Sequence, residues 1–106
     1  MNVTLHDAVA GPCLEATQPG GSLPATDAVL TNCGTGMDAT VKVVGTRVTI
    51  TGAQQNGVQS TLVKLTDSSA TGTVIGVDVF SSRKPVLVNT TCGKSGPNDW
   101  GVCTND

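Results

Sequence analysis

Aromatic and charged residues are scarce in this 106-residue chain, and both shortages limit what it can be. Aromatic side chains make up 2% of the residues and charged side chains 13%, against a charged share of about 25% in typical globular proteins. A core with so few aromatics must be built from small branched side chains. Val and Thr suit a pleated sheet better than a helix, so the composition predicts an all-β protein.

The chain also lacks a basic stripe and a long apolar segment. Its formal net charge is −2, and its six cations are spread along the sequence, which argues against nucleic-acid binding. No run approaches the roughly 18 to 20 apolar residues of a transmembrane helix, so we expect no membrane span. A chain of this length buries one modest core. We therefore expect residues 1–106 to form a single β-rich domain, and we find no repeat with a period of 20 to 50 residues.

Histidine, the residue that most often acts as a general acid or base in catalytic sites, is almost absent. His6 is the only histidine, and its neighbour Asp7 would point to the opposite face of a strand. No serine lies in a G-x-S-x-G turn, and the acidic residues fall mostly in turns, where Asp side chains bind local backbone groups. The segment 93–95 lacks the earlier glycine of a phosphate-binding loop. The sequence therefore predicts no enzyme, no cofactor and no metal.

Four cysteines indicate an oxidising compartment. They are Cys13, Cys33, Cys92 and Cys103, and three pairings are possible. Because nearby partners close loops most easily, we expect Cys13–Cys33 and Cys92–Cys103, each contributing about 3 kcal/mol in the chain-entropy model. A zinc site would need close pairs such as C-x₂-C, which are missing. Disulfides predict a secreted, periplasmic or cell-surface protein.

Alternating apolar residues predict five or six short strands. Val and Ile flank Gly45-Thr46 at period two, which predicts either a tight hairpin or one strand with a bulge at Gly45. Asn56-Gly57 predicts a type I′ hairpin turn. Further strands are expected over 58–65, 73–80 and 86–88. Such spacing predicts a small antiparallel β-sandwich, Ig-like, or a partly closed barrel, stapled by two disulfides.

Both ends of the chain read as less regular. We expect a strand over 2–6 and a loop over 15–27, because Pro and Gly are frequent in the second stretch. A helix over 5–16 is the alternative, which Gly11-Pro12 opposes. The tail from residue 92 to 106 is expected to be a loop closed by its disulfide.

The loop closed by Cys92–Cys103 is the most suggestive binding feature. It carries Trp100, the only tryptophan, together with Asp99 and Lys94. A constrained loop that presents a tryptophan loses little entropy on docking. The alternative is that the indole folds back over an open end of the sheet and caps the core. Both interpretations stay open at this stage.

Several short motifs resemble the subunits of bacterial fimbriae assembled by the chaperone–usher route. They are an early cysteine, Cys13, the segment Leu30-Thr31-Asn32-Cys33, the alternating stretch 39–43, and the small residues 69–72 leading into 75–79. The C-terminal disulfide loop is similar to that of type IV pilins. The resemblance implies a fimbrial subunit of the bacterial surface, with other protein subunits or a host surface ligand as partners. A sandwich lacking its last strand would accept a donated strand.

Together these observations predict a non-catalytic exported structural or adhesive protein. The alternative is a small secreted binding or inhibitory module that recognises a partner through the loop with Trp100.

Overall fold

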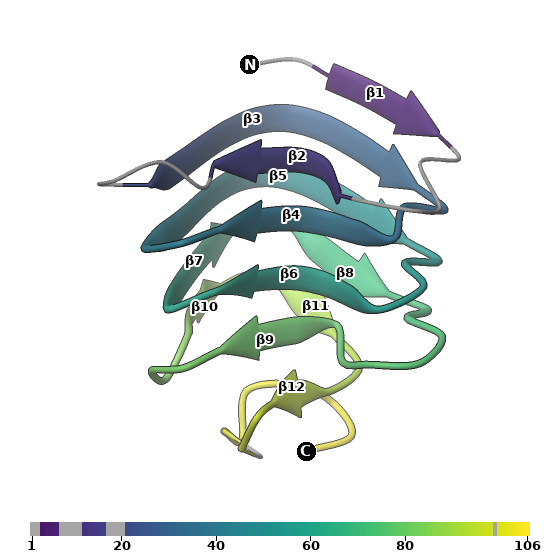
Figure 1. Ribbon diagram of the computed structural model, residues 1–106. Helices are drawn as coiled ribbons and strands as arrows, with labels where there is room; N and C mark the ends of the chain where they lie inside the picture. The colour runs from purple at the N-terminus through teal and green to yellow at the C-terminus, as the bar shows by residue number, and fades with distance from the viewer. Residues whose placement is uncertain (1–2, 7–11, 17–20, 99) are drawn as a thin grey trace.

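Every regular element of the chain is a β-strand in the computed structural model, which describes residues 3–6, 12–16, 21–98 and 100–106 (Figure 1). The strands are β1 (Val3–His6), β2 (Pro12–Ala16), β3 (Ser22–Thr31), β4 (Thr35–Ala39), β5 (Lys42–Thr51), β6 (Asn56–Ser60), β7 (Leu62–Thr66), β8 (Ser69–Thr71), β9 (Val79–Ser81), β10 (Val86–Val88), β11 (Thr91–Cys92) and β12 (Ser95–Gly96). The all-β class expected from the composition is confirmed for these residues.

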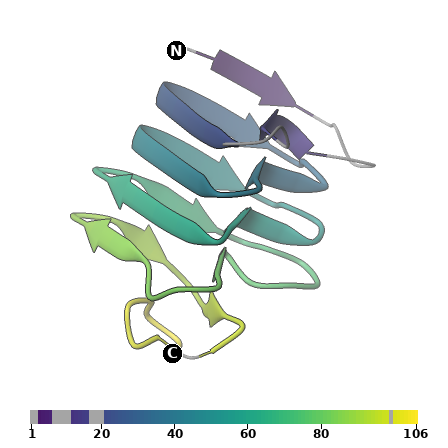
Figure 2. The ribbon, with the colours of Figure 1, turned by 60° about the vertical axis from the view of Figure 1, so that its left-hand side comes forward.

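Neighbouring strands pair in parallel, about one coil of chain apart. β3 pairs with β5 and β5 with β7 at a register of 20 residues, whereas β4 pairs with β6 and β6 with β9 at a register of 21. One sheet has the order β1-β3-β5-β7-β10, with β8 and β11 alongside, and the other has the order β12-β9-β6-β4-β2. The chain thus winds as a β-solenoid of about four turns. Its coils stack from the N-terminal end to the C-terminal end (Figures 1 and 2).

The predicted antiparallel sandwich or barrel is therefore wrong. The chain does contain a structural repeat, with a period of 20 to 21 residues, which the sequence analysis did not detect. Alternation shows that a strand buries one face, but it does not show whether the partner strand is the next one or one coil away. The repeat is hidden because packing accepts different apolar side chains at one position. Leu23, Val43 and Val63 are register partners and all are buried, yet the residue type changes from leucine to valine along the series.

The hairpin turn predicted at Asn56-Gly57 is also wrong, because both residues begin β6. The Asn56 amide donates to Gln59 Oε1 at 2.8 Å instead of stabilising a turn. A Cβ on Gly57 would lie 2.4 Å from the carbonyl oxygen of Asp78. Glycine is needed here by the close approach of the next coil rather than by a turn. The strand expected over 58–65 accordingly divides between β6 and β7.

β5 runs without interruption, so the hairpin alternative at Gly45-Thr46 is wrong. The strand bends instead at Arg47, which has a φ of 53°. The equivalent residues of the other coils, Asp27, Asp67 and Asn89, have φ values of 54°, 49° and 48°. The Asn89 amide donates to Asp67 Oδ1 at 2.7 Å. One corner of the solenoid is thus built from polar residues in the left-handed region, where Asn and Asp are enriched.

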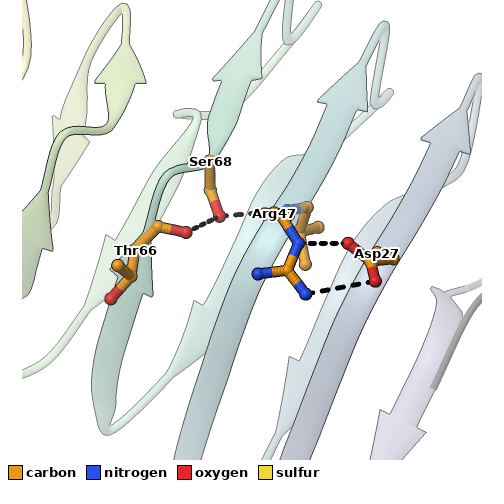
Figure 3. A network of polar contacts seen from close by, with 5 residues as sticks. Asp27, Arg47, Thr66 and Ser68 are labelled. Atoms are coloured by element: carbon orange, nitrogen blue, oxygen red, sulfur yellow. Dashed lines mark hydrogen bonds and ion pairs between the residues drawn. The ribbon is translucent and has the colours of Figure 1, made fainter.

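A polar network holds this corner together (Figure 3). The Arg47 guanidinium donates from Nε and Nη2 to the two carboxylate oxygens of Asp27, and the Nη2 bond measures 3.1 Å. That hydrogen bond, together with the charge of Arg47, holds the pKa of Asp27 below its ordinary 3.8. The Ser68 hydroxyl accepts from the Val48 backbone N–H at 3.1 Å and donates to the Thr66 carbonyl at 2.8 Å. The network therefore joins successive coils where the sheet bends.

Two other expectations differ from the structure. Of the strand expected over 73–80, only the last two residues are extended, in β9. Val74 and Ile75 lie in the preceding loop, 63% and 79% exposed. The loop expected over 15–27 contains parts of β2 and β3, and β2 also excludes the helix alternative for residues 12–16. Among the described residues, β1 pairs only with the later half of β3, so Pro24 lies at an edge, where a proline is tolerated.

The core is a set of vertical stacks of inward side chains, one from each coil. In one stack Leu30, Ile50, Ala70 and Cys92 follow one another in register, and all are buried. Fully burying an aliphatic side chain such as Leu or Ile stabilises the fold by about 1.5–3 kcal/mol. The stacks therefore supply the main favourable contribution, and in β3, β5 and β7 the residues that alternate with them face outward.

Both predicted disulfides are confirmed. Cys13 in β2 is bonded to Cys33, just after β3, and Cys92 in β11 is bonded to Cys103 in the C-terminal segment. The remaining expected strands, over 2–6 and 86–88, correspond to β1, which spans residues 3–6, and β10, and residue 2 lies outside the described residues.

Candidate functional site

A shallow groove of about 250 Å³ lies on the outward face of the sheet formed by β4, β6 and β9. Its lining is polar apart from one alanine and one phenylalanine. The lining residues are Asp38, Ala39, Thr40, Gln59, Ser60, Thr61, Phe80 and Ser82. The groove therefore lies where three successive strands reach their C-terminal ends.

Strand alternation places the central side chains of the groove. Asp38, Gln59 and Phe80 each follow a fully buried residue of the core, and each is half-buried. They are register partners on β4, β6 and β9. The exposed Glu15 of β2 lies outside the groove lining but continues the series, because it is the partner of Asp38. Neighbouring strands are about 4.8 Å apart. Glu15, Asp38, Gln59 and Phe80, hereafter the groove row, thus present four different side chains along the solenoid axis.

A second series runs beside the groove row at the turns that follow the strands. Thr40, Thr61 and Ser82, hereafter the hydroxyl row, are spaced by 21 residues, the same interval as the strand register. The Thr61 hydroxyl donates to the Thr40 carbonyl at 2.9 Å, and the Ser82 N–H donates to the Ser60 carbonyl at 3.3 Å. These bonds tie each turn to the preceding coil, so the hydroxyl row is held in position.

The groove row is polarised along its length. Glu15 and Asp38 place two carboxylates on neighbouring strands, an arrangement that costs stability through like-charge repulsion. Gln59 Oε1 accepts a hydrogen bond from Asn56, and its NH₂ group has no partner among the described residues. Phe80, the only phenylalanine of the chain, is at the other end. The row thus offers acceptors, then a donor, then an aromatic ring.

Ser60 adds a buried hydroxyl to the lining. It is 5% exposed, and within the described part of the chain its Oγ has no hydrogen-bond partner. Its register partner Ser81 is fully buried and donates to the carbonyl oxygens of Thr61 and Arg83, at 3.3 and 2.6 Å. An unsatisfied buried hydroxyl costs about 1–3 kcal/mol, so the two serines differ in energy although they occupy the same position in successive coils.

A second hollow, of about 470 Å³, lies near Lys94 and is organised by a structural carboxylate. Asp78 is buried and accepts hydrogen bonds from the backbone N–H groups of Thr73, Gly93 and Lys94, at 3.2, 2.7 and 3.3 Å. Both carboxylate oxygens are thus used to hold loops together. This region therefore has a clear structural role, and Lys94, one of the residues expected to bind a partner, belongs to it.

Trp100, the second expected binding residue, packs at the C-terminal end of the solenoid. Its indole N–H donates to the carbonyl oxygens of Ser81 and Gly96, at 3.1 and 3.4 Å, and its backbone N–H donates to Ser95 Oγ at 3.1 Å. The side chain is half-buried. This geometry fits the capping alternative, since the indole satisfies carbonyl groups of the last coils. Asp99, the third expected residue, lies outside the described residues.

Asp106 fastens the same end of the chain. Its carboxylate accepts hydrogen bonds from the hydroxyl and N–H of Ser95 and from the N–H groups of Val102 and Cys103, the three N–H bonds measuring 2.8 to 3.1 Å. Limited burial raises the pKa of this carboxyl, but the hydrogen bonds outweigh it and lower the pKa from 3.8 to about 2. The carboxylate therefore closes the loop that carries Trp100.

The groove residues Asp38, Gln59 and Phe80 were not identified from the sequence. A signal was present, because these three residues and the three residues of the hydroxyl row are both spaced by 21. The spacing becomes meaningful only once the strands are known to pair in parallel, one coil apart.

The sequence matches no protein-family model, and no curated protein and no solved structure matches it. Within the described ranges, no three His, Cys, Asp or Glu side chains are grouped so as to hold a metal ion. Nor do these ranges contain a helix with the length and hydrophobicity to cross a bilayer.

Proposed function

We propose that this protein is a non-catalytic exported module that functions in adhesion, and that it binds its target through the groove row and the hydroxyl row. The observation that carries the proposal is a line of chemically different outward side chains on a sheet whose coils are fastened to one another. A rigid surface loses little entropy when it binds. Such a face suits recognition of another surface better than it suits chemistry on a small substrate.

Export is supported by the cysteines. Two disulfides are present, and such bonds persist in secreted, periplasmic and cell-surface proteins. They fasten the segment before β3 and the segment after β12, at opposite ends of the solenoid. A module exposed to an extracellular environment gains most from bridges at the ends, where strands have a neighbour on one side only.

Membership of a fimbrium is the narrower form of this proposal. Donor-strand assembly needs a groove between strands of an incomplete sandwich, and the parallel coils described above offer a different surface. We therefore propose adhesion through a sheet face rather than assembly by strand donation. A host surface ligand is the partner that this arrangement favours over a second pilus subunit.

The alternative function is partner recognition by the loop closed by Cys92–Cys103. Part of the Trp100 ring remains accessible, which supports this alternative, whereas the two hydrogen bonds of the indole N–H support a capping role. The two functions predict different variants to be inactive.

Flow cytometry with the labelled protein on cultured epithelial cells tests the proposal. We expect the double variant Gln59→Ala/Phe80→Ala to lose cell binding. The matched control is Thr49→Ala/Lys64→Ala, which changes two exposed residues on β5 and β7 of the other sheet and should bind like the wild type. Thermal unfolding of each variant excludes loss of fold as the cause.

Equal binding by the groove variant and the wild type would contradict a role for the groove. If Trp100→Phe alone abolished binding while the groove variant retained it, the alternative would replace the proposal.

A further inference from the structure

Resting on the proposed function, we infer that the groove binds an oligosaccharide of neutral or amino sugars, whose chain crosses the strands from β2 towards β9. The four residues of the groove row and the three of the hydroxyl row would contact successive sugar units.

The backbone around the groove excludes a peptide strand as the ligand. β4 and β6 are interior strands of their sheet, with a paired neighbour on each side. Peptide recognition by strand addition needs an unpaired edge that offers N–H and C=O groups. A ligand on this face must therefore be recognised by side chains alone.

The lining side chains match the surface of a sugar. Hydroxyl groups both donate and accept hydrogen bonds, the Gln59 NH₂ group donates, and the Asp38 carboxylate accepts. Sugar hydroxyls do both, so they can bond with each of these groups. The half-buried ring of Phe80 offers an apolar face, against which the C–H face of a pyranose ring can pack. A lipid would need an apolar lining, and here the apolar side chains of the lining are those of Ala39 and Phe80.

The charge of the groove row selects the class of sugar. Glu15 and Asp38 are adjacent on β2 and β4, so an acidic sugar at this end would meet two carboxylates. A neutral sugar avoids that repulsion, and an amino sugar gains from it.

The shape and the period of the groove indicate a chain rather than a single small molecule. Its volume of about 250 Å³ is below the roughly 300–1,000 Å³ of pockets that enclose small ligands. Its side chains recur at the strand spacing of about 4.8 Å, which is close to the length of one sugar unit in an extended β-linked chain. Each additional sugar should therefore meet one additional coil.

Isothermal titration calorimetry of the intact, disulfide-bonded protein tests this inference. The probes are β-1,4-linked glucosamine and β-1,4-linked glucose oligomers of one to five units, with trigalacturonate as the anionic comparison. We expect no measurable binding of a monosaccharide, an affinity that rises with length up to three or four units, and weaker binding of trigalacturonate. Phe80→Ala should weaken tetrasaccharide binding about two- to tenfold, whereas Phe80→Tyr keeps it.

The control variant Thr49→Ala should bind the tetrasaccharide like the wild type. Binding that is independent of chain length, or that survives both Phe80→Ala and Gln59→Ala, would overturn the inference.

The cell assay repeated after periodate oxidation of cell-surface sugars separates the two proposals. Groove-dependent cell binding that survives periodate, with no oligosaccharide bound, overturns the glycan inference and leaves adhesion standing. If the wild-type protein binds neither cells nor oligosaccharides, both the adhesion proposal and the glycan inference are overturned. Cleavage of the tetrasaccharide, abolished by Asp38→Asn, would retain the glycan as ligand and overturn the non-catalytic role.

Discussion

Deleting one whole coil should leave a folded protein, because the strands on either side of the deletion keep the same pairing register. Deletion of residues 42–61 joins Val41 directly to Leu62, and Leu62 is the register partner of Lys42. β7 would then pair with β3, and β9 with β4, through positions that are already aligned with the missing coil. The variant is therefore expected to remain a parallel β-solenoid that is one coil shorter.

The expected cost follows from the size of the deleted unit. The register between coils is 20 residues, and native proteins gain roughly 0.05–0.15 kcal/mol of stability per residue, so the free energy of unfolding should fall by about 1–3 kcal/mol. The denaturant m value should fall by about one fifth, since it scales with the surface exposed on unfolding. The deletion would bring Asp27 beside Asp67, and Asp27→Asn is included to remove this like-charge pair.

Urea unfolding followed by far-UV circular dichroism, with the disulfides intact, measures both quantities. The matched control deletes only β5, Lys42–Thr51, in the same Asp27→Asn background, and so removes half a coil and breaks the register. We expect this control to be unfolded or aggregated. Cooperative unfolding of both deletion variants, or of neither, would refute the solenoid register.

Three further predictions concern single side chains. Ser60→Ala should raise the free energy of unfolding by about 1 kcal/mol in urea titrations, because it removes an unsatisfied buried hydroxyl. Ser81→Ala in the next coil should lower the free energy of unfolding by about 1 kcal/mol, because it removes a hydrogen-bonded hydroxyl. Equal effects of the two substitutions would mean that Ser60 has a hydrogen-bond partner. Trp100→Phe should lower the melting temperature by about 4–8 °C through loss of the indole hydrogen bonds, a cost of about 1 kcal/mol, and an unchanged melting temperature would argue against capping. The pKa of Asp106 is lowered to about 2, so the stability it contributes is present above about pH 4 and is lost as the pH falls towards 2; Asp106→Asn should flatten this part of the pH–stability profile relative to the wild type, and parallel profiles would contradict the role of the carboxylate.

The sequence predicted the kind of element and the covalent links well. The shortage of aromatics and the abundance of Val and Thr indicated strands, and the spacing of Cys13, Cys33, Cys92 and Cys103 indicated the two disulfides that are present. These inferences depend on local properties, namely side-chain shape and loop length. They hold for any arrangement of the strands.

Pairing direction could not be predicted in the same way. Asn56-Gly57 is a strong hairpin signal, yet here the glycine is needed for the close approach of Asp78 in the next coil. The corner at Arg47 is similarly invisible, because an arginine with positive φ is uncommon and is held by an ion pair with Asp27, one coil away. Long-range contacts decide both positions, so local propensity led to the wrong topology.

The groove row differs from other outward rows in a way that packing does not explain. Thr31, Thr51 and Thr71 occupy one outward register position of β3, β5 and β8, and their identity follows from the preference of β-branched residues for sheets. At the groove row the same kind of position holds two acids, an amide and an aromatic ring, although the residues that precede Asp38, Gln59 and Phe80 are buried, as are those that precede the three threonines. Adjacent carboxylates carry a cost for a solvated sheet. That a pair of acids is kept on this face against such a cost supports the proposed role of the groove row in ligand binding.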